Sequence, residues 1–247
     1  MCLAAVGQSA VGFGFALFAA PPLVWLGIPL PDVIAMVATS SIFQSAIGAR
    51  HLRAAVPWRL SLIATAFRLV SVIAGLWLLK RLAVLNADQV KMVVGSILCL
   101  LVAIQFFCRP HPVERTHWAW AGLALVASGL LAGVSGMGGP PLVLWAMAHN
   151  WSTEKTRGFL FAVFATSIPV QIFLMCLTFG VDMLWNVAAG AAFLPLVYLG
   201  SAIGLPIGNR IPKERLRRIA YAILLIIGAG ASVPPLLACL HSLAAKP

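Results

Sequence analysis

The second half of the chain contains the stretch Ser135-Gly136-Met137-Gly138-Gly139-Pro140-Pro141-Leu142-Val143-Leu144-Trp145. A related stretch lies near the start, Gly12-Phe13-Gly14-Phe15-Ala16-Leu17-Phe18-Ala19-Ala20-Pro21-Pro22-Leu23-Val24-Trp25. In each, glycines and a proline pair interrupt a strongly hydrophobic segment, and both residue types break helices. A broken helix in lipid leaves backbone N–H and C=O groups unpaired unless protein, ligand or cavity water satisfies them. Two such breaks, one in each half of a chain, typically indicate a transporter binding site.

The composition is that of a membrane protein. Of the 247 residues, 62% are hydrophobic and 9% are charged, and the mean hydropathy is +1.00. A soluble domain carries about 25% charged residues. Long apolar runs such as 60–79 and 219–240 meet the requirement of about 20 residues for a helix that crosses the hydrocarbon core. We therefore expect an all-α, polytopic transmembrane helical bundle embedded in the lipid bilayer.

The strongly basic charge balance has a topological explanation. The formal net charge is +11, but the 17 Lys and Arg residues lie almost wholly in short loops between apolar segments. Basic loops are the topological signature of membrane proteins. We therefore expect no nucleic acid among the partners of this chain.

Metal, redox and enzyme chemistry are disfavoured by spacing. The cysteines have no C-x-x-C pair, so zinc and thioredoxin-like chemistry are not expected. His111 and His117 have no carboxylate or thiol at ligand spacing, which favours interfacial histidines. An intramembrane enzyme would need an acid/base or metal cluster, and none is evident, so no cofactor is predicted. Met1–Ala10 has no basic region, so no cleavable signal peptide is expected.

Order and spacing indicate an internal duplication. Gly75-Leu76 with Arg81 aligns with Gly204-Leu205 and Arg210 at a constant offset. We predict a first transmembrane repeat over 1–107, a linker loop over 108–116 and a second repeat over 117–247. The apolar segments lie at about 3–28, 33–49, 60–79, 90–107, 117–148, 158–178, 184–207 and 217–240.

Loop charges bear on the orientation of the two halves. If each broken segment enters the membrane and returns to the same face, most Lys and Arg residues of the loops fall on one face. If each broken segment crosses once, the charges are divided more evenly. The positive-inside rule favours the first arrangement, which makes the halves inverted repeats of about four spans each.

The proline pairs are predicted to set the starts of two short helices. Proline lacks a backbone N–H and disfavours helix at the preceding residue, so helices are expected from Leu23 and from Leu142. A helix N-terminus carries about half a positive charge and attracts anions. The two ends would form a small electropositive pocket at mid-membrane. The alternative is that the glycines only let helices pack closely.

The second motif resembles the signature of the TauE/SafE sulfite exporter family of bacterial membrane permeases. The similarity lies in Gly133-x-x-Gly136-Met137-Gly138-Gly139-Pro140-Pro141-Leu142, followed by Lys155-Thr156-Arg157 and an apolar helix, while the first half fits through Gly12, Gly14 and Pro22. The resemblance covers essentially the whole chain. It implies an inner-membrane permease, and it implies sulfite, sulfonates or other sulfur-containing or organic anions as substrates.

Polar residues within apolar segments could line the site. Thr39 and Gln44 repeat with the same spacing as Thr166 and Gln171. They could donate to an anion, or they could bond to the carbonyl four residues earlier or to a neighbouring helix. Arg68 lies near the middle of an apolar span, where a charged side chain should face protein or a cavity. It could hold an anion through charge-assisted hydrogen bonds or reach the interface.

We predict a secondary transporter that exports a small anion, sulfite or an organosulfonate among the candidates, across the bacterial inner membrane. The alternative is a non-transporting integral membrane assembly or interaction protein. The predicted substrate-binding residues are Gly12, Gly14, Pro22, Ser135, Gly136, Gly138, Gly139, Pro140, Pro141, Thr39, Gln44, Thr166, Gln171 and Arg68.

Overall fold

The computed structural model describes residues 1–11, 13–107 and 118–210, and within these ranges it contains helices and no strand. Gly12, the predicted linker 108–116 and the last apolar segment 217–240 lie outside the described residues. The helices are α1 (Cys2–Val11), α2 (Phe15–Trp25), α3 (Leu30–His51), α4 (Trp58–Leu82), α5 (Ala87–Phe107), α6 (Trp118–Ser135), α7 (Gly139–Met147), α8 (Thr153–Phe179), α9 (Met183–Ala192) and α10 (Leu194–Arg210).

Several helices are suited to crossing a membrane. Among the described residues, α3, α4, α6 and α8 are long and apolar enough to do so, and the bent pair α9 and α10 raises the number of candidate spans to five. The all-helical, polytopic membrane fold predicted from composition is confirmed. The inverted orientation of the two halves stays a prediction.

The long helix α4 shows why the bundle suits lipid. Its outward face carries exposed apolar side chains, among them Phe67, Val70 and Trp77. Its inward face buries small or polar residues, including Ser61, Thr65, Arg68, Ser71 and Gly75. Water would favour the reverse arrangement, whereas hydrocarbon favours apolar groups outside and polar groups paired inside.

Both glycine stretches interrupt helices. α1 ends at Val11 and α2 begins at Phe15, while α6 ends at Ser135 and α7 begins at Gly139. Gly14 has φ 104° and Gly136 has φ 73°, a left-handed conformation that glycine adopts without the penalty of a side chain. The sequence needs glycine at these two positions.

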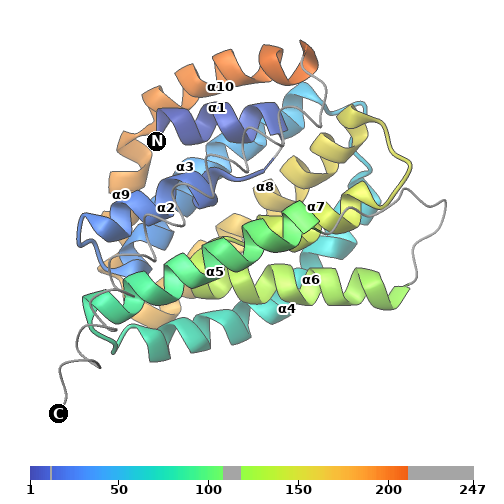
Figure 1. Cartoon of the computed structure of the whole chain (residues 1–247). Coiled ribbons are helices and arrows are strands. Elements are labelled where there is room, and N and C mark those ends of the chain that lie inside the picture. Colours follow the sequence, from blue (N-terminus) through green and yellow to red (C-terminus); the bar gives the residue numbers. More distant parts are fainter. Residues whose placement is uncertain (12, 108–117, 211–247) are drawn as a thin grey trace.

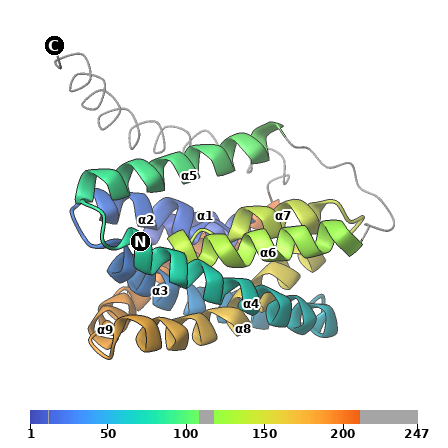
Figure 2. The same ribbon diagram turned by 90° about the horizontal axis from the view of Figure 1, so that it is seen from below.

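The chain folds back at each interruption. The hydroxyl of Ser128 donates to the carbonyl oxygen of Gly138 at 2.5 Å, so the backbone after α6 returns alongside that helix. In the first half, a β-carbon added to Gly7 would lie 3.2 Å from the ring of Phe18, which is in α2. The pairs α1/α2 and α6/α7 are in contact, and α6 and α7 lie side by side in both views (Figure 1, Figure 2).

The predicted helix start at Leu23 is wrong. Pro21 and Pro22 lie inside α2, which begins upstream of them at Phe15. The turn is made by the glycines, and the prolines leave the carbonyls one helical turn earlier without an N–H donor. In the second half, Pro140 and Pro141 lie in the first turn of α7, which begins at Gly139 rather than Leu142. First-turn prolines lose no intrahelical bond.

A further bend occurs in the segment expected over 184–207. α9 and α10 are separated at Phe193 and meet at 49°. Pro195 is the second residue of α10, and proline disfavours helix at the residue before it and donates no N–H. The Leu194-Pro195 pair is the local signal for this bend.

Helices of the two halves pack in a reciprocal pattern. α4 packs along α6, and α10 packs along α1, while α8 contacts α4 and α3 contacts α9. Figure 1 shows the α1/α10 pair on one side of the bundle and the α4/α6 pair on the other. In each case the third segment of one half packs on the first segment of the other, as a two-fold relation between the halves would produce.

Close glycine contacts join both of these pairs. A β-carbon on Gly133 would lie 2.7 Å from Gly75, and one on Gly204 would lie 2.5 Å from the carbonyl oxygen of Val6. Small residues let transmembrane helices approach closely. Gly75, Gly133 and Gly204 therefore let helices pack closely, which is the alternative role considered for the glycines. None of them belongs to the two breaks.

Candidate functional site

The two breaks and α4 line a cavity of about 50 Å³. The first break contributes Gly14 and the first turn of α2, and the second contributes Gly136–Gly139. The remaining walls come from α1, α3, α4 and α8. Residues far apart in the sequence therefore meet at one buried space.

Arg68 is the charged residue of this cavity. Its side chain is 2% exposed, and its Nε donates to the Ser128 hydroxyl at 3.0 Å. Its Nη1 donates to the Ser167 hydroxyl at 2.5 Å. Nη2 lies 2.9 Å from the place where a β-carbon of Gly138 would be. Because two bonds hold the guanidinium, its third nitrogen is positioned against the second break.

The Ser128 hydroxyl connects Arg68 to that break. It accepts from Nε of Arg68 and donates to the Gly138 carbonyl. This chain of bonds fixes the guanidinium and the turn together. Displacement of Gly138 should therefore displace the charged group as well.

Amide side chains from α1 and α8 complete the polar lining. Nε2 of Gln8 donates to Ser45 at 3.2 Å, and Oε1 of Gln8 accepts from Ser41 at 3.4 Å. Nε2 of Gln171 donates to the Ala132 carbonyl at 2.9 Å. Gln8, Ser41 and Gln171 all line the cavity.

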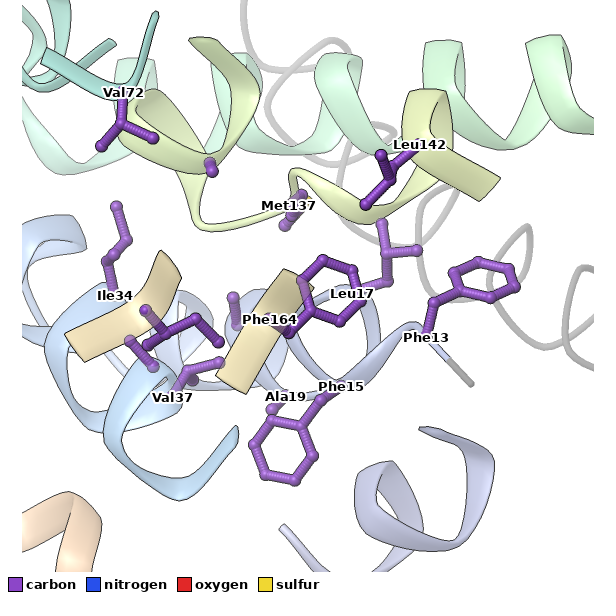
Figure 3. Close-up of a cluster of buried hydrophobic side chains, with 14 of the residues drawn as sticks. Phe13, Phe15, Leu17, Ala19, Ile34, Val37, Val72, Met137, Leu142 and Phe164 are labelled. Carbon is purple, nitrogen blue, oxygen red and sulfur yellow. The ribbon is translucent and has the colours of Figure 1, made fainter. Parts of the chain in front are cut away.

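Apolar side chains form the rest of the wall. Figure 3 shows Met137 in the turn between α6 and α7, among side chains that include Leu17 of α2, Ile34 of α3 and Phe164 of α8. All four line the cavity and are at most 7% exposed. The cavity is thus a small polar space within a tightly packed apolar cluster.

Two helix N-termini border the cavity. α2 begins beside Gly14 and α7 begins beside Gly138, and neither has a side-chain cap. The first-turn N–H groups of a helix have no intrahelical acceptor, although in α7 Pro140 and Pro141 have no N–H and Gly139 is left as the donor of that turn. Next to a buried cation, such groups can donate hydrogen bonds to the oxygens of a negatively charged ligand.

The structure brings six of the predicted site residues to the cavity, namely Gly14, Arg68, Gly136, Gly138, Gly139 and Gln171. Seven others do not line it. Pro22 is on the exposed side of α2, and Ser135 bonds to the Leu131 carbonyl. Pro140 and Pro141 border a separate apolar groove beside α5 and α6.

The other three make hydrogen bonds within or between helices. Thr39 donates to the Ala35 carbonyl at 2.8 Å, and Thr166 donates to the Ala162 carbonyl and pairs with Thr65 at 2.7 Å. Gln44 donates to the Ala5 carbonyl and the Ser9 hydroxyl. The carbonyl bonds of Thr39 and Thr166 lie within their own helices, four residues back. The contact of Thr166 with Thr65 and the bonds of Gln44 join neighbouring helices.

Sequence reasoning missed Gln8 and Ser128 and did not place Ser41 or Ser167 at the site. Ser128 lies two helical turns before the break, and nothing in the local pattern points to Arg68. A signal did exist for Ser167, because it directly follows the repeated Thr166. The pairing of these serines with one arginine depends on the packing of α4 against α6 and α8.

Arg157 is another buried cation. It lies at the start of α8 with 1% exposure, and its Nη2 donates to the Ser9 carbonyl at 2.6 Å. This contact brings positive charge to the C-terminal end of α1, where it is favourable. Arg157 does not line the cavity, so its position indicates a structural role there.

No group of three or more His, Cys, Asp and Glu side chains that could hold a metal ion is found in the part of the chain that the structure describes. The features of the cavity are one buried guanidinium, hydroxyl and amide groups, and backbone amides at two helix starts. These features define a multi-pass helical membrane protein with a small, electropositive internal site.

The chain belongs to the sulfite exporter TauE/SafE family, whose model matches residues 1–231. The resemblance predicted from the second glycine-proline motif is thereby confirmed, and the protein is a membrane transporter rather than an enzyme. A relative from Cupriavidus necator, named "Probable sulfite/organosulfonate exporter TauE", is 25% identical over 229 residues. The match spans 92% of this chain and 89% of the relative. No solved structure matches the chain.

Proposed function

We propose that this protein exports a small sulfur-containing anion, sulfite or an organosulfonate, through the cavity between the two breaks. The family supports an exporter, and the relative's name supports this substrate class. The bacterial inner membrane is the proposed location. Several apolar helices joined by basic loops, as in multi-pass membrane proteins, support this location.

One observation carries the proposal. Both interrupted segments and the buried guanidinium of Arg68 line the same cavity. Burying a cation in a membrane span costs free energy, and a bound anion would offset part of that cost. Ionisable residues inside membrane spans therefore often mark ion or substrate sites. The first turn of α2, and Gly139 at the start of α7, add backbone N–H groups that can donate to anion oxygens.

The energy for export can come from the membrane potential. The sequence contains no nucleotide-binding motif of the phosphate-loop type. In a cell that is negative inside, outward movement of an anion releases about 2.3 kcal/mol per charge per 100 mV. A dedicated proton relay is therefore unnecessary.

The test is sulfite flux in proteoliposomes, compared between the unmodified protein and Arg68→Gln. The substitution removes the positive charge but keeps a hydrogen-bonding side chain, so KM for sulfite should rise about tenfold or more, in line with the loss of a charged hydrogen bond. Arg59→Gln is the control, because Arg59 is in the same helix and is exposed.

Absence of flux with the unmodified, correctly inserted protein would favour the non-transporting alternative. An unchanged KM in Arg68→Gln, with flux intact, would place the anion elsewhere in the molecule.

A further inference from the structure

The size, charge and polar groups of the cavity restrict which anion it can hold. We infer that it binds small oxyanions with a single negative charge, hydrogensulfite among the sulfur anions. It rejects doubly charged anions and sulfonates that carry an ammonium group. This inference rests on the proposed function, because it concerns selectivity at the same site.

The size limit comes from packed side chains. The cavity measures about 50 Å³, and on this measure one water molecule needs about 10–15 Å³, so the space suits a ligand of a few heavy atoms. Ile34, Met137 and Phe164 form its walls and are almost fully buried. Because protein interiors are close-packed, a long organic tail would require these side chains to move. A sulfur atom with its oxygens needs far less space.

The charge limit comes from the balance of fixed charges. Arg68 is the charged residue of the lining. Each break also brings the C-terminus of one helix next to the N-terminus of another. Their partial charges are about half an elementary charge each and opposite in sign, so they largely cancel. One negative charge on the ligand then neutralises Arg68, and a second would be buried without a partner.

The polar lining that the structure describes offers no negatively charged partner for an ammonium group. Among the described residues its acceptors are neutral, and none of those that line it is a carboxylate. Gln8 and Gln171 are already held by bonds to Ser45, Ser41 and the Ala132 carbonyl. An ammonium group would also lie in the same small space as the guanidinium of Arg68. A zwitterionic sulfonate therefore loses its hydration without compensation.

Two pairs of anions with matched shapes test these limits by calorimetric titration of the purified full-length protein. Methanesulfonate and sulfate have similar shapes but differ in charge. Propane-1-sulfonate and taurine have similar lengths but differ in the ammonium group. We expect methanesulfonate to bind about tenfold or more tightly than sulfate, a difference that is measurable as a ratio of Kd values. Both longer sulfonates should bind at least as weakly as sulfate.

A variant with a larger cavity separates size from charge. Ile168 lines the cavity and is 7% exposed, so Ile168→Ala should create room for the tail of propane-1-sulfonate. The Kd of propane-1-sulfonate should fall about tenfold in this variant, while the Kd of taurine should not change. Leu160→Ala is the matched control, because Leu160 is a buried residue of the same helix away from the cavity. It should improve neither ligand.

The outcomes distinguish failure of the selectivity inference from failure of the proposed function. Binding of sulfate or taurine as tightly as methanesulfonate would overturn the selectivity inference and leave the proposed function standing. Failure of Ile168→Ala to separate the two longer sulfonates would also overturn it. If neither sulfite nor any other anion binds and no flux occurs, the proposed function itself fails.

Discussion

At the scale of single residues, Arg68 and Gly138 depend on one another. The guanidinium is held by Ser128 and Ser167, and Ser128 also holds the Gly138 carbonyl. A β-carbon on Gly138 would lie 2.6 Å from the β-carbon of Ala132 and 2.9 Å from Nη2 of Arg68. Glycine is required there by space, since its φ of −74° is open to any residue.

This dependence predicts that Gly138→Ala impairs transport. The added methyl group must displace Arg68 or separate the turn from α6, so sulfite flux should fall about tenfold or more, as for other misplacements of about 1 Å. Gly139→Ala should retain more flux, because its β-carbon meets Phe13 only at ordinary contact distances of 3.5–3.6 Å.

The control for both is Gly122→Ala, whose added carbon meets nothing within 4 Å. Equal flux in the Gly138 and Gly139 variants would contradict the steric link between the turn and Arg68.

At the scale of helices, the glycine seam between α4 and α6 supports the site from outside the cavity. It is formed by Gly75, Gly129 and Gly133, each of which faces the neighbouring backbone. The seam brings α4 close enough for Arg68 to reach Ser128 of α6. Without a hydrophobic driving force between helices in lipid, such close packing provides much of their association energy.

We therefore expect Gly133→Leu to destabilise the protein. A β-carbon there would lie 2.6 Å from the Val72 carbonyl and 2.7 Å from Gly75, so the helices must separate. Overpacking costs about 1–3 kcal/mol, and the thermal unfolding midpoint in detergent should fall by several degrees.

Gly122→Leu provides the comparison on the same helix, since that position has open space around it. A midpoint for Gly133→Leu equal to that of Gly122→Leu would show that close packing at the seam does not determine the stability of the protein.

At the scale of the whole molecule, the reciprocal packing of α1 with α10 and of α4 with α6 agrees with a duplicated chain. The fold-back at each break agrees with segments that enter the membrane and return. The positions of the loops relative to the membrane decide whether the halves are inverted repeats. That arrangement remains a prediction.

Single cysteines in a background free of native cysteines test it. Arg53, Asn86 and Asn150 are exposed loop positions. If the broken segments return to their own face, Arg53→Cys and Asn150→Cys should react with a membrane-impermeant maleimide from the same side, and Asn86→Cys from the other. If the segments cross, Asn150→Cys should instead share the side of Asn86→Cys. The labelling pattern in right-side-out and inside-out vesicles decides between the two.

Much of this architecture follows from the sequence alone. Apolar length and low charge predict a helical membrane protein, because backbone groups in lipid must be paired within each segment. The doubled glycine pattern predicts where helices break, since glycine adopts without penalty the left-handed backbone found at Gly14 and Gly136. The family resemblance also rests on local residues. These features depend on residues that are close together in the sequence, so they can be predicted from it.

Only the tertiary structure decides which polar groups face the cavity. Thr39 and Gln44 match Thr166 and Gln171 in spacing, yet only Gln171 lines the space, while the unforeseen Gln8 does as well. The prolines were expected to start α2, but they lie within it. The partners of Arg68 come from α6 and α8, brought together by contacts between distant segments. Spacing along one helix determines a face, whereas the neighbour of that face depends on how all the helices pack.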